Sequence, residues 1–119
     1  MKKLLLASAT ILLSACVTTV PQKSVWVYIN SGAIQCESKG KTGTETALLL
    51  KSENIAVAKT ECGHLVNVAV IAMCGGPTSN INVHHISNAD LEKAQALGFE
   101  NVTTLKQQDN PGYEFGECK

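Results

Sequence analysis

The sequence predicts a small α+β domain, and three stretches of the chain indicate this class. Residues 25–29 alternate β-branched with aromatic side chains, which is the two-residue period of a β-strand. Residues 42–54 open with the T-x-x-E pattern of a capping box and continue in residue types that favour a helix. Residues 65–74 are the most apolar run after residue 16 and lack alternation. That run predicts a strand covered on both faces, at the centre of its sheet.

The remaining strands are expected where short runs of strand-forming residues lie between turn-forming ones, at residues 55–60, 81–86 and 101–105. Gly63 and His64 are interpreted as the turn that leads into the central apolar strand. By composition, residues 75–80 are expected to form a loop and residues 106–119 a polar tail.

A second helix is expected over residues 87–99, because both of its ends carry recognisable signals. Ser87 or Asn88 can cap its start, since a short polar side chain accepts bonds from the free N–H groups of the first turn. Gly98 can end the helix in the left-handed conformation, with Phe99 packing back on the last turn.

These elements give the order β-α-β-β-β-α-β on one sheet, a single-sheet sandwich stapled by disulfide bonds. Each half contains a βαβ-like unit, so the arrangement has ferredoxin-like character with one extra strand. Right-handed crossovers place both helices on the same face of the sheet. The other face then also needs cover, because the central strand is expected to be buried on both sides. The tail, the loops or a partner could supply that cover.

The N-terminal end of the chain predicts where the protein is sent. Lys2 and Lys3 precede an apolar run at residues 4–13. About ten residues suit the core of a secretory signal and are too few to span a bilayer, which needs roughly 20. The motif LSAC that follows, at residues 13–16, resembles the lipobox of bacterial lipoproteins.

This resemblance implies that residues 1–15 are a signal peptide and that Cys16 is lipidated. Residues 16–24 then form a lipidated N-terminus and tether, and residues 25–119 form a single α+β domain. Val17 stands where an aspartate would indicate retention in the inner membrane, so the resemblance implies the outer membrane. The domain would face the periplasm, with exposure at the cell surface as the alternative.

The composition argues against nucleic acid as a partner. All ten basic residues are lysines, and two of them lie in the signal. The rest of the chain therefore carries eight basic and ten acidic residues. These lysines are dispersed along the chain, whereas phosphate binding needs clustered basic side chains. The chain also contains only five aromatic residues from which a stacking platform could be built.

Four cysteines remain once Cys16 is assigned to lipid, namely Cys36, Cys62, Cys74 and Cys118. An even number in an exported chain predicts two disulfide bonds. The expected sheet puts Cys62 and Cys74 at opposite edges, which makes their pairing the least plausible. Cys36–Cys62 with Cys74–Cys118 is favoured, and Cys36–Cys74 with Cys62–Cys118 is the main rival.

No group of residues predicts catalysis, a metal or a cofactor. His84 and His85 are adjacent in a strand and point to opposite faces, while His64 lies in the expected turn. The cysteine spacings lack the close pairs of zinc and thioredoxin-like sites, and no serine occupies a G-x-S-x-G elbow. We therefore expect no enzyme activity.

These observations favour a membrane-anchored envelope lipoprotein that acts as a non-catalytic interaction, assembly or stress-sensing component. Its expected contacts are the membrane, through the lipid anchor, and an envelope protein partner. The alternative is a small inhibitor or immunity-type lipoprotein. A flat edge strand or apolar sheet face would favour assembly, and a rigid disulfide-held loop aimed outward would favour inhibition. A deep pocket with convergent polar groups would instead indicate an enzyme.

Overall fold

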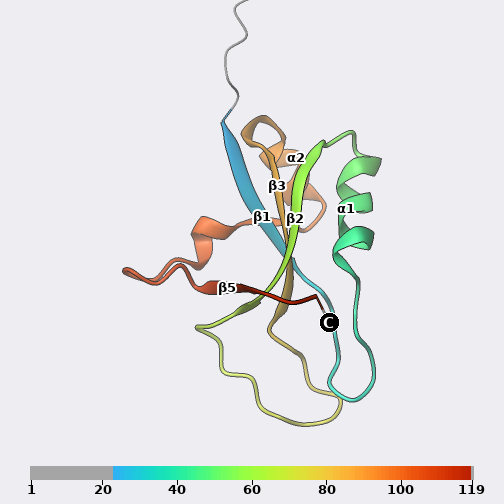
Figure 1. Ribbon diagram of the computed structural model, residues 1–119, viewed down its shortest axis with the longest axis vertical. Coiled ribbons are helices and arrows are strands. Elements are labelled where there is room, and N and C mark those ends of the chain that lie inside the picture. Colours follow the sequence, from blue (N-terminus) through green and yellow to red (C-terminus); the bar gives the residue numbers. More distant parts are fainter. Residues whose placement is uncertain (1–22, 119) are drawn as a thin grey trace, which may run out of the picture.

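The computed structural model describes residues 23–118, which form one curled antiparallel sheet of five strands in the order β4-β1-β3-β2-β5 (Figure 1). Each strand runs antiparallel to its neighbours. In chain order the strands are β1 Ser24–Asn30, β2 Val57–Leu65, β3 Asn80–Ser87, β4 Glu100–Asn101 and β5 Tyr113–Gly116. The prediction of an α+β domain is confirmed.

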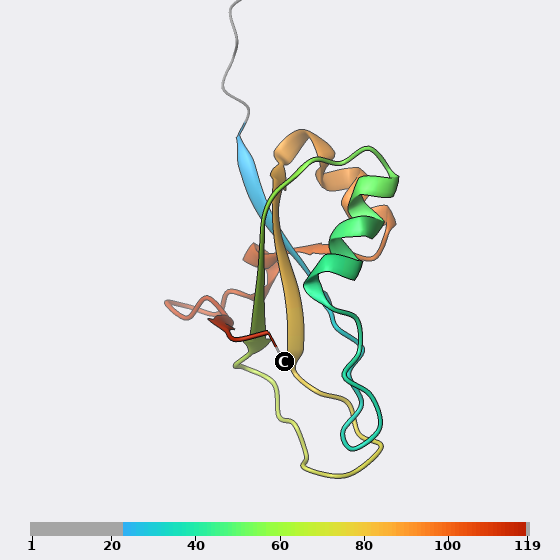
Figure 2. The ribbon, with the colours of Figure 1, turned by 45° about the vertical axis from the view of Figure 1, so that its right-hand side comes forward.

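Two helices connect these strands and pack on one face of the sheet (Figure 2). Helix α1, Gly43–Ser52, links β1 to β2, and helix α2, Leu91–Ala96, links β3 to β4. Short 3-10 turns, η1 Asn88–Asp90 and η2 Val102–Leu105, precede α2 and follow β4. Because β1 and β2 are both antiparallel to β3, they run in the same direction on either side of it.

The predicted signals of both helices are present in the structure. Thr42 Oγ1 accepts a bond from Glu45 N at 3.1 Å, and Glu45 Oε2 accepts one from Thr42 N at 2.7 Å, so the capping box is complete. Ser87 Oγ accepts from the N–H of Ala89 and caps the second helical segment. Gly98 ends that segment at a φ of 98°, a conformation that glycine adopts without strain.

The predicted central strand at residues 65–74 is wrong. β2 continues through Gly63 and His64, which were expected to be a turn, and ends at Leu65. The chain then forms an irregular loop over residues 66–79. The centre of the sheet belongs to β3, which pairs with β1 on one side and β2 on the other. The fifth strand comes instead from the expected polar tail, so the observed strand-and-helix order is β-α-β-β-α-β-β. Of the strand expected at residues 101–105, only the first residue lies in β4, and Val102–Leu105 form the 3-10 turn η2 instead.

The main core lies between the sheet and the two helices. Its fully buried members come from β1, α1, β3, α2 and the segments after the helices, and they are Val27, Leu50, Ile55, Ile86, Ala94 and Phe99. Burying one of its Val, Leu, Ile or Phe side chains contributes about 1.5–3 kcal/mol.

The helix-free face of the sheet is covered by the tail, one of the three sources expected from the sequence. Trp26 on β1 stacks on His85 of β3 with ring centroids 4.7 Å apart. Trp26 also lies 5.6 Å from Phe115 of β5, although β3 and β2 separate these two strands. In a flat sheet with about 4.8 Å between strands this distance would be about 14 Å, so the sheet must curl. On the same face, Ile81 and Val83 are completely buried.

Candidate functional site

The structure contains the rival disulfide pairing, so the favoured pairing is wrong. Cys36 is bonded to Cys74 and Cys62 to Cys118, with Cα–Cα distances of 5.0 and 5.1 Å. The error follows from the misassigned central strand, which was expected to carry Cys74 to the far edge. Cys62 instead lies within β2 opposite Gly116 of β5, which brings Cys118 close. Cys36 and Cys74 meet between two loops at one end of the domain.

The loop of residues 66–79, hereafter the apolar loop, exposes the side chains that were expected to form the central strand. It extends from the end of the domain opposite to the start of β1 (Figure 1). No charged residue occurs in it. Its large exposed side chains, with their exposed fractions, are Val68 47%, Val70 44%, Ile71 75% and Met73 58%. Soluble domains seldom leave so many adjacent apolar side chains in water without a role.

Gln35 holds the apolar loop in one shape. Its side-chain Nε2 donates to the carbonyl oxygens of Ile71 and Pro77, both at 2.9 Å. Its Oε1 accepts from Met73 N at 3.1 Å. Its backbone carbonyl accepts from Gly75 N, and its own N–H donates to Gly76 O. The neighbouring disulfide at Cys36 closes the same junction, so the exposed segment is clamped by five hydrogen bonds and one covalent bond.

His84 is a buried structural residue. Its Nε2 lies 2.8 Å from Thr46 Oγ1 and its Nδ1 lies 2.9 Å from Thr60 Oγ1, so both ring nitrogens have a hydroxyl partner. Its ring also meets Phe99 edge-on. Burial, and secondarily the positive charge of Lys51, lower the pKa of His84 to about 4. The ring is therefore neutral at physiological pH and inaccessible to a substrate.

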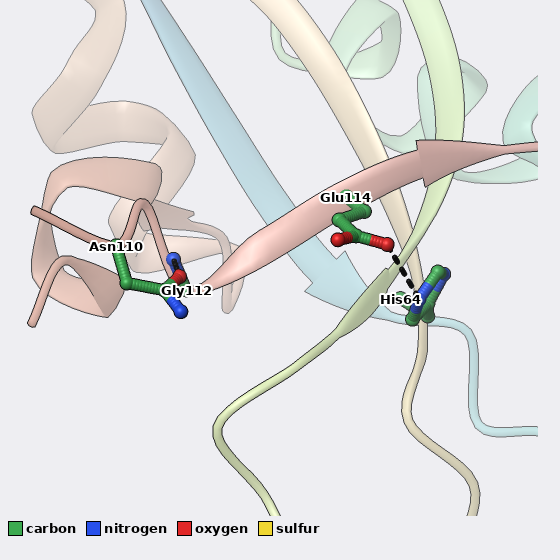
Figure 3. A network of polar contacts seen from close by, with 4 residues as sticks. All are labelled: His64, Asn110, Gly112 and Glu114. Carbon is green, nitrogen blue, oxygen red and sulfur yellow. Dashed lines mark hydrogen bonds and ion pairs between the residues drawn. The ribbon is translucent and has the colours of Figure 1, made fainter.

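The other two histidines, His85 and His64, contact different residues from His84 and from each other. As expected, His85 points to the opposite face from His84, where it stacks on Trp26. His64 lies on β2, and its Nε2 is 3.4 Å from Glu114 Oε2 of β5 (Figure 3). Among residues 23–118, no three His, Cys, Asp or Glu side chains are grouped so that they could hold a metal ion.

The turn before β5, also drawn in Figure 3, explains how the tail reaches the sheet. Asn110 Oδ1 accepts from the N–H of Gly112 at 2.8 Å, and Gly112 has a φ of 89°. Gly63 on β2 allows the strands to approach closely, since a Cβ there would lie 2.5 Å from Glu114 O. Burial raises the pKa of Tyr113, the first residue of β5. The turn at Asn110 and Gly112 and the close approach of β5 to Gly63 thus bring the tail onto the helix-free face of the sheet.

A polar cleft of about 450 Å³ opens where α1 begins. Its lining includes Lys39, Lys41 and Gly43, the first residue of α1, together with the Cys62–Cys118 disulfide, His64 and Glu117. Asn82 of β3, only 3% exposed, also lines it. The sequence analysis missed this cleft, because its residues come from five separate segments and carry no shared motif.

The predicted signal peptide, the lipidation site Cys16 and most of the tether lie outside the described residues. Within the described part of the chain, no helix is both long and apolar enough to cross a membrane. Comparisons with protein-family models, with curated proteins and with solved structures found no match to this chain. The site must therefore be interpreted from its own geometry.

Proposed function

We propose that this chain is a lipid-anchored envelope lipoprotein that binds a protein partner through the apolar loop and acts without catalysis. The lipobox-like motif ending at Cys16 supports the anchoring, and Val17 favours the outer membrane. In this proposal residues 1–15 are removed and the domain faces the periplasm. Assembly and stress sensing are the roles that such a component would serve.

The observation that carries this proposal is the exposed, clamped apolar loop. Burying one of its large side chains in a partner would contribute about 1.5–3 kcal/mol. A flexible loop would lose much of that gain, since ordering each side chain on binding costs about 0.5–1.5 kcal/mol. Because Gln35 and the Cys36–Cys74 disulfide already order the backbone, more of the gain remains as affinity.

The position of the loop favours a protein rather than the anchoring membrane. The start of β1 and the apolar loop lie at opposite ends of the domain (Figure 1). The eight residues 17–24 that follow the lipidated Cys16 reach at most about 28 Å even when extended. An anchored domain therefore presents the loop away from its own membrane. The fitting partner has an uncharged apolar groove, since the loop itself carries no charge.

Site-specific photo-crosslinking in the native envelope tests this function. A photoreactive amino acid replaces Ile71 in one variant and Leu48 in a matched control, because Leu48 on α1 is also exposed, at 56%. We expect a discrete protein adduct from position 71, mapped to an apolar groove of that protein, and none from position 48. Removing Cys36 and Cys74 together should weaken the adduct. Equal labelling from both positions, or adducts to lipid alone, would contradict the proposal.

The anchor has its own test. Changing Cys16 to Ser should move the protein out of the membrane fraction while the domain keeps its two disulfides, because lipid attachment and folding use different cysteines. Membrane fractionation and intact mass measure both properties. A variant that stays firmly membrane-bound would refute the lipid anchor and leave the loop test unaffected.

An inhibitor or immunity-type role is the second candidate, and a specific feature favours it. A rigid loop held outward by a disulfide is the form in which an inhibitor presents a segment to another protein's cleft. The two roles differ in the consequence of binding. If the crosslinked partner is an enzyme or toxin that loses activity when the purified domain is added, inhibition is supported. A partner that stays fully active supports assembly.

We further propose a ferredoxin-like character for the first six elements. The order β-α-β-β-α-β, with β3 between β1 and β2 and both helices on one face, supports it. The fifth strand is then an addition at the β2 edge, locked by Cys62–Cys118. An experimental structure with a different neighbour for β4 would contradict this assignment.

A further inference from the structure

The polar cleft at the start of α1 contains a buried acceptor without a donor. Asn82 Nδ2 donates to Lys41 O at 2.9 Å, which fixes the orientation of the amide. The partner that the geometry offers to Asn82 Oδ1 is Cys62 Sγ, at 4.0 Å. That sulfur is bonded to Cys118 and carries no hydrogen, so it cannot donate. Within the described chain, Asn82 Oδ1 therefore has no hydrogen-bond donor.

The lining of the same cleft also contains positive groups. Lys39 and Lys41 line it, and neither ammonium group is paired with a carboxylate of residues 23–118. Gly43, the first residue of α1, also lines it, and its N–H is one of those that a helix leaves without an internal partner. The dipole of α1 adds positive potential at this end.

Two carboxylates oppose this positive charge. Glu117 also lines the cleft and is exposed to solvent. Glu45 is engaged by the capping box, where its Oε2 accepts from Thr42 N. Glu45 offsets the helix N-terminus and Glu117 offsets one of the two exposed lysines, so the cleft keeps an excess of one positive charge and favours an anionic group.

We propose that this cleft binds a carboxylate that carries an adjacent N–H group, as found at the carboxyl end of a peptide. The carboxylate would lie against Lys39, Lys41 and the N-terminus of α1, and the N–H would donate to Asn82 Oδ1. An inorganic phosphate or a simple carboxylate satisfies only the first half of this site. The volume of about 450 Å³ accommodates one or two residues. Ser79, the last residue of the apolar loop, lines this cleft, but none of the loop's large exposed side chains does.

A matched set of small ligands tests the proposal on the purified full-length protein. N-acetylglycine carries both groups, acetate only the carboxylate, N-methylacetamide only the N–H, and glycine an ammonium in place of the amide. We expect N-acetylglycine to bind about tenfold more tightly than acetate, because acetate leaves the buried Asn82 acceptor unpaired. It should also bind about tenfold more tightly than N-methylacetamide, because N-methylacetamide has no charge for the lysines to bind. Binding is measured by calorimetry or by amide chemical shifts of Gly43 and Asn82.

The ligand series also separates the two sources of this chemistry. Tighter binding of N-acetylglycine than of glycine indicates a peptide end, and the reverse indicates a free amino acid as the natural ligand. Equal affinity for acetate and N-acetylglycine would overturn the role of Asn82 and with it the proposal. Failure of all four ligands to bind would leave the cleft as a water-filled feature and would also overturn it.

Variants locate the binding and do not depend on the ligand comparison. Lys41→Gln should weaken binding of N-acetylglycine about fivefold or more, because it removes charge and keeps the backbone carbonyl that holds Asn82. Lys59→Gln is the matched control, since Lys59 lies on β2 away from the cleft, paired with Glu61. Equal losses in both variants would indicate a general charge effect and contradict the assignment. Crosslinking from position 71 should be the same in both, which separates this site from the proposed function.

Discussion

The apolar loop is exposed although its sequence is hydrophobic, whereas strand β3 is mostly buried although half of its residues are polar Asn or His. The loop contains the run VNVAVIAMC, which is free of charges, and it lies exposed at one end of the domain. β3 contains two asparagines and two histidines in the segment NINVHHIS, yet it is the central strand and is mostly buried. The difference lies in partners: β3 has strands on both sides and hydroxyl groups for its buried His84. Polar groups can be buried where each has a partner, and apolar ones stay exposed where the chain offers no cover.

Removing the disulfides one at a time should give the largest effect and separates the two regions. In the chain-entropy model each bond, closing 56 or 38 residues, contributes about 4 kcal/mol. Replacing Cys62 and Cys118 by Ser should cost more than this, because β5 and the contact of Phe115 with Trp26 are also lost. Urea denaturation measures both variants. An equal or larger loss for the Cys36–Cys74 pair would show that the apolar loop belongs to the cooperative core.

A pair of matched isoleucines tests the comparison directly. Ile86→Ala on β3 should lower the free energy of unfolding by about 2–5 kcal/mol, because it leaves a cavity in the core. Ile71→Ala in the apolar loop should change the free energy of unfolding by less than about 0.5 kcal/mol, because the Ile71 side chain is already mostly exposed to water in the folded state. Thermal or chemical unfolding measures both values. A large loss for Ile71→Ala would mean that the loop packs against the domain in solution.

Acid should destabilise the region around β3 through His84. An unfolded histidine takes up its proton near pH 6.5, whereas the pKa of folded His84 is about 4, so between these values the unfolded state holds one more proton. This contribution to stability is complete above pH 6.5 and is lost as the pH falls towards 4, by about 3 kcal/mol in all. His84→Gln should have a flatter stability curve across that window. Parallel curves for the two proteins would contradict the neutral buried state.

Local signals predicted the elements whose ends are set by neighbouring residues. The capping box at Thr42 and Glu45, the Ser87 cap and the left-handed Gly98 all occur where expected, because each depends on groups within a few residues. Strands β1 and β3 were also predicted from alternation and β-branched residues. Their places in the sheet were not, because periodicity carries no information about neighbours.

The candidate sites were largely beyond sequence reasoning for the same reason. Nothing marks Gln35 as the clamp of a loop that begins about thirty residues later, since its partners are backbone groups of any residue type. The acceptor on Asn82 became unpaired only because Cys62 bonds to Cys118. Predicting this unpaired acceptor would have required the disulfide connectivity, which depends in turn on which strand pairs with β2.

The sequence by itself determined the class of the domain, two helices, two strands, and the expectation of an oxidised cysteine framework, since these follow from composition and short-range spacing. Only the tertiary structure decided that the tail becomes β5, that the most apolar segment stays outside, and which cysteines join. The physical reason is that each of these outcomes is a competition between distant segments for one edge of β2. Such a competition is settled by the free energy of the whole sheet, to which every strand and both helices contribute.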